Sequence, residues 1–222
     1  MKSAYKVWTH PLCAALCLLS APAWAQSEPK PAIPPLTTEA AAAMLDGGLT
    51  LEQRKDGDFD GDGETDTVIV GRSDDRRVLM ALLAYRSEVD LGHQPVGTLE
   101  LDAYPLGGAS ISMRKGVLVI EDLTGGTTAT QTTYRYRYEP KTQRMRLIGL
   151  DAQNYSRTNS HGTLKLSWNL LTGDRVIERG EPNVSGKGDE AIVYAPAKRD
   201  KRASKPLYME TTPNPDELLN TL

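Results

Sequence analysis

The sequence is poor in the side chains that most often act as nucleophiles, metal ligands and aromatic anchors. Its 222 residues include two cysteines, three histidines, three tryptophans and one phenylalanine. Cys13 and Cys17 both lie in an apolar N-terminal segment that we expect to be removed. Leu16 directly precedes Cys17, where a lipoprotein signal would need a small residue. The processed chain is therefore expected to lack disulfides and cysteine nucleophiles, and to depend on its hydrophobic core for stability.

An excess of positive charge is also lacking. The formal net charge is −3 at pH 7, and removal of Lys2 and Lys6 with the N-terminal segment makes the chain more acidic. This balance argues against nucleic acid as a partner. The apolar run at 12–19 is far shorter than the roughly 20 residues that cross a bilayer. We therefore expect no transmembrane segment after processing.

The N-terminal residues predict export. Lys2 and Lys6 form a basic region, the apolar run follows, and Ala23-Trp24-Ala25 is a small-x-small cleavage site. The prolines that follow fix the backbone torsion φ and remove hydrogen-bond donors, which predicts an extended tether. We expect a periplasmic or secreted protein composed of a signal peptide (1–25), a Pro-rich tether (26–36) and a single β-domain (37–222).

Beyond the tether, the hydrophobic pattern has mostly a period of two and is interrupted by Gly, Asp, Asn and Pro clusters. This pattern predicts an all-β fold, an antiparallel meander of short strands arranged as a curled sheet, a sandwich or an incomplete propeller. The expected strands are 49–54, 67–71, 77–85, 97–103, 109–114, 117–122, 131–139, 144–151, 163–171, 175–180 and 190–195. The expected turns are 72–75, 114–116, 140–143 and 172–174.

Short helices are expected near both termini. Thr38 is suited to cap the first, with Ala40 to Leu45 as its body and Gly47 as its stop. Near the other end, Asn214 is a capping residue and Pro215 suits the first helical position.

One acidic segment has the spacing of a calcium loop. Calcium binds six to eight oxygens at roughly 2.3–2.6 Å, and carboxylates at every second residue can surround it. Gly61 and Gly63 permit the positive φ angles that such a tight loop requires. The expected ligands are the side chains of Asp58, Asp60 and Asp62, the backbone carbonyl of Glu64, and Asp66 directly or through water. Asp56 adds a nearby charge as an outer ligand.

The segment does not fit a helix-loop-helix site. The twelfth position from Asp58 is Ile69 where a bidentate glutamate would be needed, and the β-branched run 67–70 predicts a strand. We therefore expect a calcium-binding β-hairpin loop. The alternatives are a solvated acidic turn without a metal, and magnesium, which prefers fewer carboxylates and retains its waters.

The segment at 57–70, GDFDGDGETDTVIV, resembles the calcium loop of FG-GAP and VCBS-type repeats, which occur in β-propeller domains such as those of integrin α chains. In that pattern Asp58, Asp60, Asp62 and Asp66 are the side-chain ligands. A propeller would carry several such loops, whereas this chain has one. The wider layout is similar to a group of uncharacterised secreted bacterial proteins. The segments that carry this likeness are the loop and residues 77–83, 111–113, 116–120, 134–138, 146–151, 169–173 and 205–207. This likeness implies the fold and export, but it does not indicate any activity.

The predicted hairpin at 133–150 separates two kinds of side chain. With its turn at 140–143, Glu139 lies opposite Arg144, Arg137 opposite Arg146 and Tyr136 opposite Leu147. One face then carries Tyr134, Tyr136, Tyr138, Met145 and Leu147, and the other, the arginine face, carries Arg135, Arg137, Arg144 and Arg146. The arginine face is either an anion-binding patch or an ordinary solvated surface, while the tyrosine face is expected in the core.

Catalytic signatures are few. His93 and His161 have no metal-ligand spacing, and no nucleophile-elbow sequence is present. We therefore expect a non-catalytic binding module whose partner is an envelope or secreted protein, for instance a toxin, or a glycan. One alternative is a hydrolase of an envelope polymer that would use acids near the loop or the two histidines. Another is a structural or adhesive protein.

Overall fold

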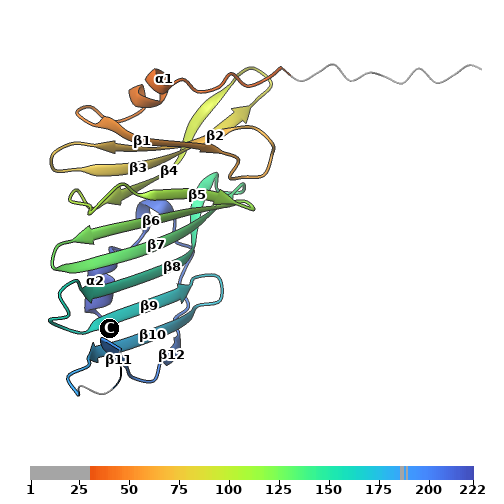
Figure 1. Ribbon diagram of the computed structural model, residues 1–222. Coiled ribbons are helices and arrows are strands. Elements are labelled where there is room, and N and C mark those ends of the chain that lie inside the picture. Colours follow the sequence, from red (N-terminus) through yellow and green to blue (C-terminus); the bar gives the residue numbers. More distant parts are fainter. Residues whose placement is uncertain (1–30, 186–187, 189) are drawn as a thin grey trace, which may run out of the picture. The chain divides into compact units, whose positions relative to one another are not determined.

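The computed structural model describes residues 31–185, 188 and 190–222, so the predicted signal peptide lies outside the described residues. Residues 33–222 form one compact unit (Figure 1). Its helices are α1 (Thr38–Ala43), the 3₁₀ helix η1 (Met209–Thr211) and α2 (Pro215–Asn220). Its strands are β1 (Thr50–Gly57), β2 (Asp66–Arg72), β3 (Arg77–Arg86), β4 (Leu91–Leu101), β5 (Ser110–Arg114), β6 (Val117–Gly125), β7 (Thr128–Glu139), β8 (Arg144–Ser156), β9 (Thr163–Asn169), β10 (Asp174–Pro182), β11 (Ile192–Tyr194) and β12 (Lys198–Lys201).

The strands form two antiparallel sheets. The smaller sheet has the order β1-β2-β3-β4. The larger, eight-stranded sheet has the order β11-β10-β9-β8-β7-β6-β5, with β12 also paired to β10. Within each sheet, strands that are consecutive in sequence pair with one another. The exceptions are β4 and β5, which belong to different sheets, and β12, which pairs with β10. The predicted all-β meander with short helices near both ends is therefore confirmed, and it takes the form of two packed sheets.

Three details differ from the sequence predictions. The cap of α1 is Thr37 rather than Thr38, because the Thr37 hydroxyl accepts a hydrogen bond from the Ala40 N–H at 3.1 Å. Strand β4 begins at Leu91, well before the predicted 97–103. It includes Pro95, which is tolerated because it lies beside a bulge and because β4 is the end strand of the smaller sheet. Strand β12 was not predicted. Its charged sequence is typical of an edge strand, and its pairing with β10 depends on the tertiary fold.

The smaller sheet is covered on both faces. Val68 and Val70 in β2 belong to the main core between the two sheets, whereas Ile69 points to the opposite face. There Ile69 packs with Ala41 of α1 and with Leu45, which follows α1. A strand buried on both faces shows a continuous apolar run instead of an alternation, which is the pattern in β2 and β3.

The C-terminal segment closes the core over the inner face of the larger sheet. The Leu147 N–H of β8 donates to the Leu207 carbonyl at 2.8 Å, so the segment pairs with a free stretch of that strand. Met209 is buried and packs closely on Gly97, where an added Cβ would lie 3.0 Å from its sulfur. Leu218 and Leu219 of α2 are also buried in the main core. The short terminal helix thus contributes two side chains to the core.

A buried arginine joins the two sheets. Arg77 of β3 is fully buried, and its two terminal nitrogens lie 2.9 Å from Glu52 of β1 and 2.9 Å from Asp122 of β6. The Asp122 side chain is itself 4% exposed. Burial raises the pKa of the Asp122 carboxyl above its ordinary value, and the hydrogen bond from Arg77 only partly opposes this shift. The guanidinium is therefore needed to neutralise a carboxylate that water reaches poorly.

We predict that Arg77→Met lowers the free energy of unfolding by about 3–5 kcal/mol, because it leaves Asp122 as an uncompensated buried charge. The double variant Arg77→Met/Asp122→Leu should recover much of the loss, since both charges are then gone. Urea denaturation measures both effects. The matched control is Arg76→Met, because the neighbouring Arg76 forms only exposed ion pairs with Asp46 and Glu100. Equal destabilisation by the two single variants would contradict the role assigned to Arg77.

Candidate metal centre

The acidic segment forms the loop of the β1–β2 hairpin. Gly57, the last residue of β1, pairs with Asp66, the first residue of β2, and residues 58–65 connect them. Gly61 and Gly63 have φ angles of +88° and +87°, a conformation that favours glycine over residues with a side chain. The hairpin predicted from the β-branched residues after the loop is therefore the structure observed.

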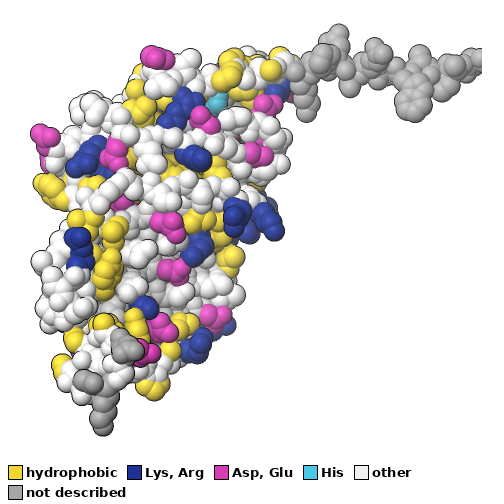
Figure 2. All heavy atoms as spheres, viewed as in Figure 1, with side chains coloured by type: hydrophobic (Ala, Val, Ile, Leu, Met, Phe, Trp, Pro, Cys, Tyr) yellow, Lys and Arg dark blue, Asp and Glu magenta, His cyan; other side chains and the backbone are white. Residues whose placement is uncertain are grey.

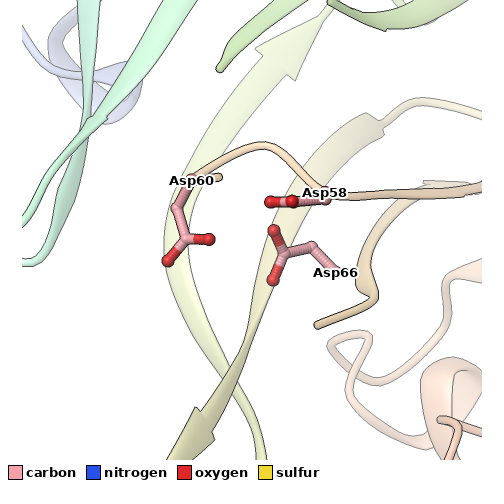
Figure 3. Close-up of side chains that lie close together, drawn as sticks. All are labelled: Asp58, Asp60 and Asp66. Atoms are coloured by element: carbon pink, nitrogen blue, oxygen red, sulfur yellow. The ribbon is translucent and has the colours of Figure 1, made fainter. Parts of the chain in front are cut away.

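Three carboxylates of the loop converge. One oxygen each from Asp58, Asp60 and Asp66 lies within 4.8 Å of the other two. Figure 3 shows the three side chains pointing toward a common space, with Asp58 and Asp66 on one side and Asp60 opposite. Like charges at this separation repel one another unless a cation or protons neutralise them. The group is an acidic triad that could bind a metal ion.

Backbone N–H groups of the loop hold these carboxylates in place. Asp58 accepts hydrogen bonds from the Gly61 N–H at 2.6 Å and the Gly63 N–H at 3.1 Å. Asp60 accepts one from the Asp62 N–H at 3.1 Å. The loop is thus folded around its own carboxylates.

Asp66 has a different environment from the other two. It is fully buried, and its two oxygens accept hydrogen bonds from the backbone N–H groups of Phe59 and Ala84, both at 2.9 Å. Burial raises the pKa of Asp66 to about 6, and the nearby charges of Asp60 and Asp62 add to this shift while the two hydrogen bonds oppose it. Asp66 therefore fastens the loop to β3 as well as contributing to the triad.

The remaining predicted ligands lie outside the triad. Asp62 accepts a hydrogen bond from the Glu64 N–H at 2.8 Å, and the Glu64 side chain pairs with Arg86 at 2.6 Å. Asp56 accepts hydrogen bonds from Arg54 at 2.9 Å and from the Thr67 hydroxyl at 2.8 Å. The ligand roles of Asp62 and of the Glu64 carbonyl stay predictions.

Tertiary structure also brings a histidine to the loop. The His93 Nε2 atom of β4 lies 3.2 Å from the Thr65 carbonyl oxygen. No sequence pattern connects these positions, which meet because β4 pairs with β3. His161 is engaged elsewhere, at 2.7 Å from the Thr128 hydroxyl. The two histidines thus have separate local partners.

The hairpin of β7 and β8 has the predicted register. Glu139 lies opposite Arg144, Arg137 opposite Arg146, and Tyr136 opposite Leu147. The tyrosine face lies on the core, where Tyr134 and Tyr136 are buried and Tyr138 packs against the cluster. On the arginine face, three arginines pair with carboxylates of the same chain: Arg135 with Asp151, Arg144 with Glu210 and Arg146 with Glu139. These pairs relieve the repulsion between like charges placed opposite one another on the two strands.

Comparison with known proteins gave no relative: no protein family, curated protein or solved structure matches the chain. The resemblance to FG-GAP and VCBS-type loops therefore stays a prediction. None of the helices in the described part of the chain is long and apolar enough to cross a membrane.

We predict that Asp66→Asn destabilises the metal-free protein by about 1–3 kcal/mol, because an amide has one acceptor oxygen and leaves a buried N–H without a partner. The control is Asp62→Asn in the exposed part of the loop, where the amide oxygen can still accept from the Glu64 N–H. Both are measured by urea denaturation at pH 5 with a chelator present, because Asp66, whose pKa is raised to about 6, is then largely neutral and its replacement by an amide relieves no buried charge. Equal stability of the two variants would show that Asp66 does not fasten the loop.

Proposed function

We propose that this chain is an exported calcium-binding β-protein that acts as a non-catalytic binding module in the periplasm or envelope. The observation that carries the proposal is the convergence of Asp58, Asp60 and Asp66 within a hairpin loop whose glycines adopt positive φ. Its partner would be a secreted or envelope protein, for instance a toxin, or a glycan. The apolar N-terminal segment supports export.

Calcium suits the triad better than magnesium. Calcium accepts a flexible arrangement of many oxygens, including several carboxylates, whereas magnesium requires a strict octahedron and keeps most of its waters. The triad supplies three carboxylates, and Asp62 and the Glu64 carbonyl lie in the same loop to complete the oxygen set. Thiolate and imidazole ligands, which softer metals prefer, are absent from residues 58–66.

The bound metal would order one end of the smaller sheet. Phe59, inside the loop, is fully buried in the main core and contacts the Tyr138 ring with centroids 6.5 Å apart. Asp66 connects the same loop to Ala84 of β3. Neutralising the triad would therefore stabilise a loop that is already anchored at two points, which is a structural role for the metal rather than a sensing one.

A hydrolase is the second candidate, and one cavity favours it. This acidic cavity, of about 230 Å³, lies at the junction of β4, β6 and β7 with the segment before α2, and Asp102, Asp122 and Asp216 line it. The raised pKa of the Asp122 carboxyl is a property of general acids. However, Asp122 is already bound to Arg77, and the volume is below the roughly 300 Å³ of typical ligand sites. Release of soluble fragments from peptidoglycan by the purified chain would support this candidate.

We predict that calcium raises the free energy of unfolding of the wild-type chain by about 2.7 kcal/mol when free calcium is about 100-fold above its dissociation constant. The double variant Asp58→Asn/Asp60→Asn should lose this response. Thermal denaturation with calcium or with chelator measures it. The matched control is Asp74→Asn/Asp75→Asn in the exposed β2–β3 turn, which should keep the full response. An unresponsive wild-type chain would refute the calcium site.

The calcium response should also depend on pH. In the metal-free protein the pKa of Asp66 is raised to about 6, so the folded state holds this proton more tightly than the unfolded state does. This protonation stabilises the folded state fully at pH values below the ordinary pKa of an aspartate, and the stabilisation is lost as the pH rises through about 6. Calcium must displace the same proton, so its affinity should increase through that range and level off above about pH 7. Calorimetric titrations at several pH values measure the trend, and a flat profile would contradict it.

A further inference from the structure

The outer face of the larger sheet contains a groove that the metal site does not explain. Its volume is about 460 Å³, within the roughly 300–1,000 Å³ range of small-molecule sites. Side chains from β7, β8, β9 and β10 line it on the side opposite the main core. The groove is therefore open to solvent, and the C-terminal segment does not cover it.

The strand register arranges these side chains in two rows that cross the strands. In each row, every residue lies directly opposite the next on the neighbouring strand. The first row is Thr133, Asp151, Ser167 and Val176, and the second is Gln131, Gln153, Lys165 and Glu178. With neighbouring strands about 4.8 Å apart, each row spans roughly 14 Å. The groove is therefore long enough for an extended ligand that lies across the strands.

Part of this lining makes contacts within the chain. Asp151 accepts a hydrogen bond from the Ser167 hydroxyl at 2.7 Å and pairs with Arg135 at 2.6 Å. Gln153 donates to the Thr163 hydroxyl at 3.1 Å, which leaves its carbonyl oxygen available as an acceptor. Lys165 lies over the Tyr194 ring, with its ammonium 4.4 Å from the ring centroid. These contacts fix the directions in which the groove can donate and accept.

Three other groove side chains remain available for a ligand. Within the described ranges 31–185, 188 and 190–222, the side chains of Gln131, Thr133 and Glu178 make no hydrogen bond or ion pair. They offer an amide, a hydroxyl and a carboxylate, which together donate and accept. The groove thus presents unused polar groups of both kinds along one surface.

The charges of the groove balance. Asp151 is paired with Arg135, and Glu178 lies opposite Lys165 on the neighbouring strand. Figure 2 shows acidic and basic side chains interspersed over this part of the molecule. A strongly anionic or cationic polymer would meet as much repulsion as attraction here. Charge complementarity therefore favours a neutral ligand.

The geometry points to a neutral oligosaccharide as the occupant of this groove. Sugar hydroxyls donate and accept, so they match a lining of amides, hydroxyls and carboxylates, and sheet faces of other small β-folds bind oligosaccharides. An extended peptide would instead need free backbone groups or side-chain pockets, whereas the backbone here is paired within the sheet and Val176 is the one apolar side chain in the two rows. The inference rests on the proposed binding function and identifies its ligand class.

Calorimetric titration of the full purified chain with chitotetraose, cellotetraose and maltotetraose, in millimolar calcium, tests this proposal. At least one tetrasaccharide should bind saturably and be recovered intact. Gln131→Ala and Glu178→Gln should each weaken that binding about tenfold, since each removes or changes a hydrogen-bonding group that has no role in the fold. The control Glu88→Gln, in the exposed β3–β4 turn, should bind like the wild-type chain. Thermal denaturation checks that all variants are folded.

Two results would overturn the groove assignment. One is no binding of any of the three tetrasaccharides by a wild-type chain that still responds to calcium, which would leave the calcium proposal intact. The other is binding that Gln131→Ala and Glu178→Gln leave unchanged, which would locate the sugar elsewhere. Cleavage of a tetrasaccharide would instead refute the non-catalytic function, and the sensitivity of that reaction to the two variants would still decide the groove. Absence of a calcium response refutes the metal site alone, because the sugar titration is read independently.

Discussion

The buried carboxylate of Asp66 is the constraint on which the acidic loop depends. Its oxygens bind the backbone N–H groups of Phe59 and Ala84, so it fixes the loop to β3. Phe59 is thereby held in the core, and Asp58 and Asp60 are brought around the same point. Burial also raises the pKa of Asp66 to about 6, so the proposed metal would compete with a proton at this carboxyl. One side chain thus couples folding and charge to the metal binding proposed for the triad.

A second buried charge, on Arg77, connects the two sheets. Arg77 bridges Glu52 in β1 and Asp122 in β6, so the ends of the core are joined by charge-assisted hydrogen bonds as well as by apolar contacts. The C-terminal segment then covers the rest of the inner face through Met209 and α2. This leaves the outer face of the larger sheet open, and that face holds the polar groove.

The sequence predicted the local features well because local interactions decide them. Asn214 and Pro215 begin α2 as expected, and the β7–β8 register follows from the short turn at 140–143. The start of β4 and all of β12 were missed, because Pro95 and a run of charged residues read as loop when their partner strands are unknown. Pairing between distant segments overrides weak local preference.

Alternating hydrophobicity and carboxylates at every second residue are properties of neighbouring positions, so the all-β class and the acidic hairpin loop could be inferred from the sequence alone. Which carboxylates meet depends on the tertiary structure. It brought Asp58, Asp60 and Asp66 together, buried Asp66 and placed His93 beside the loop. It also arranged Gln131, Gln153, Lys165 and Glu178 in one row. Cross-strand neighbours are set by sheet register and core packing, and no short window of sequence contains that information.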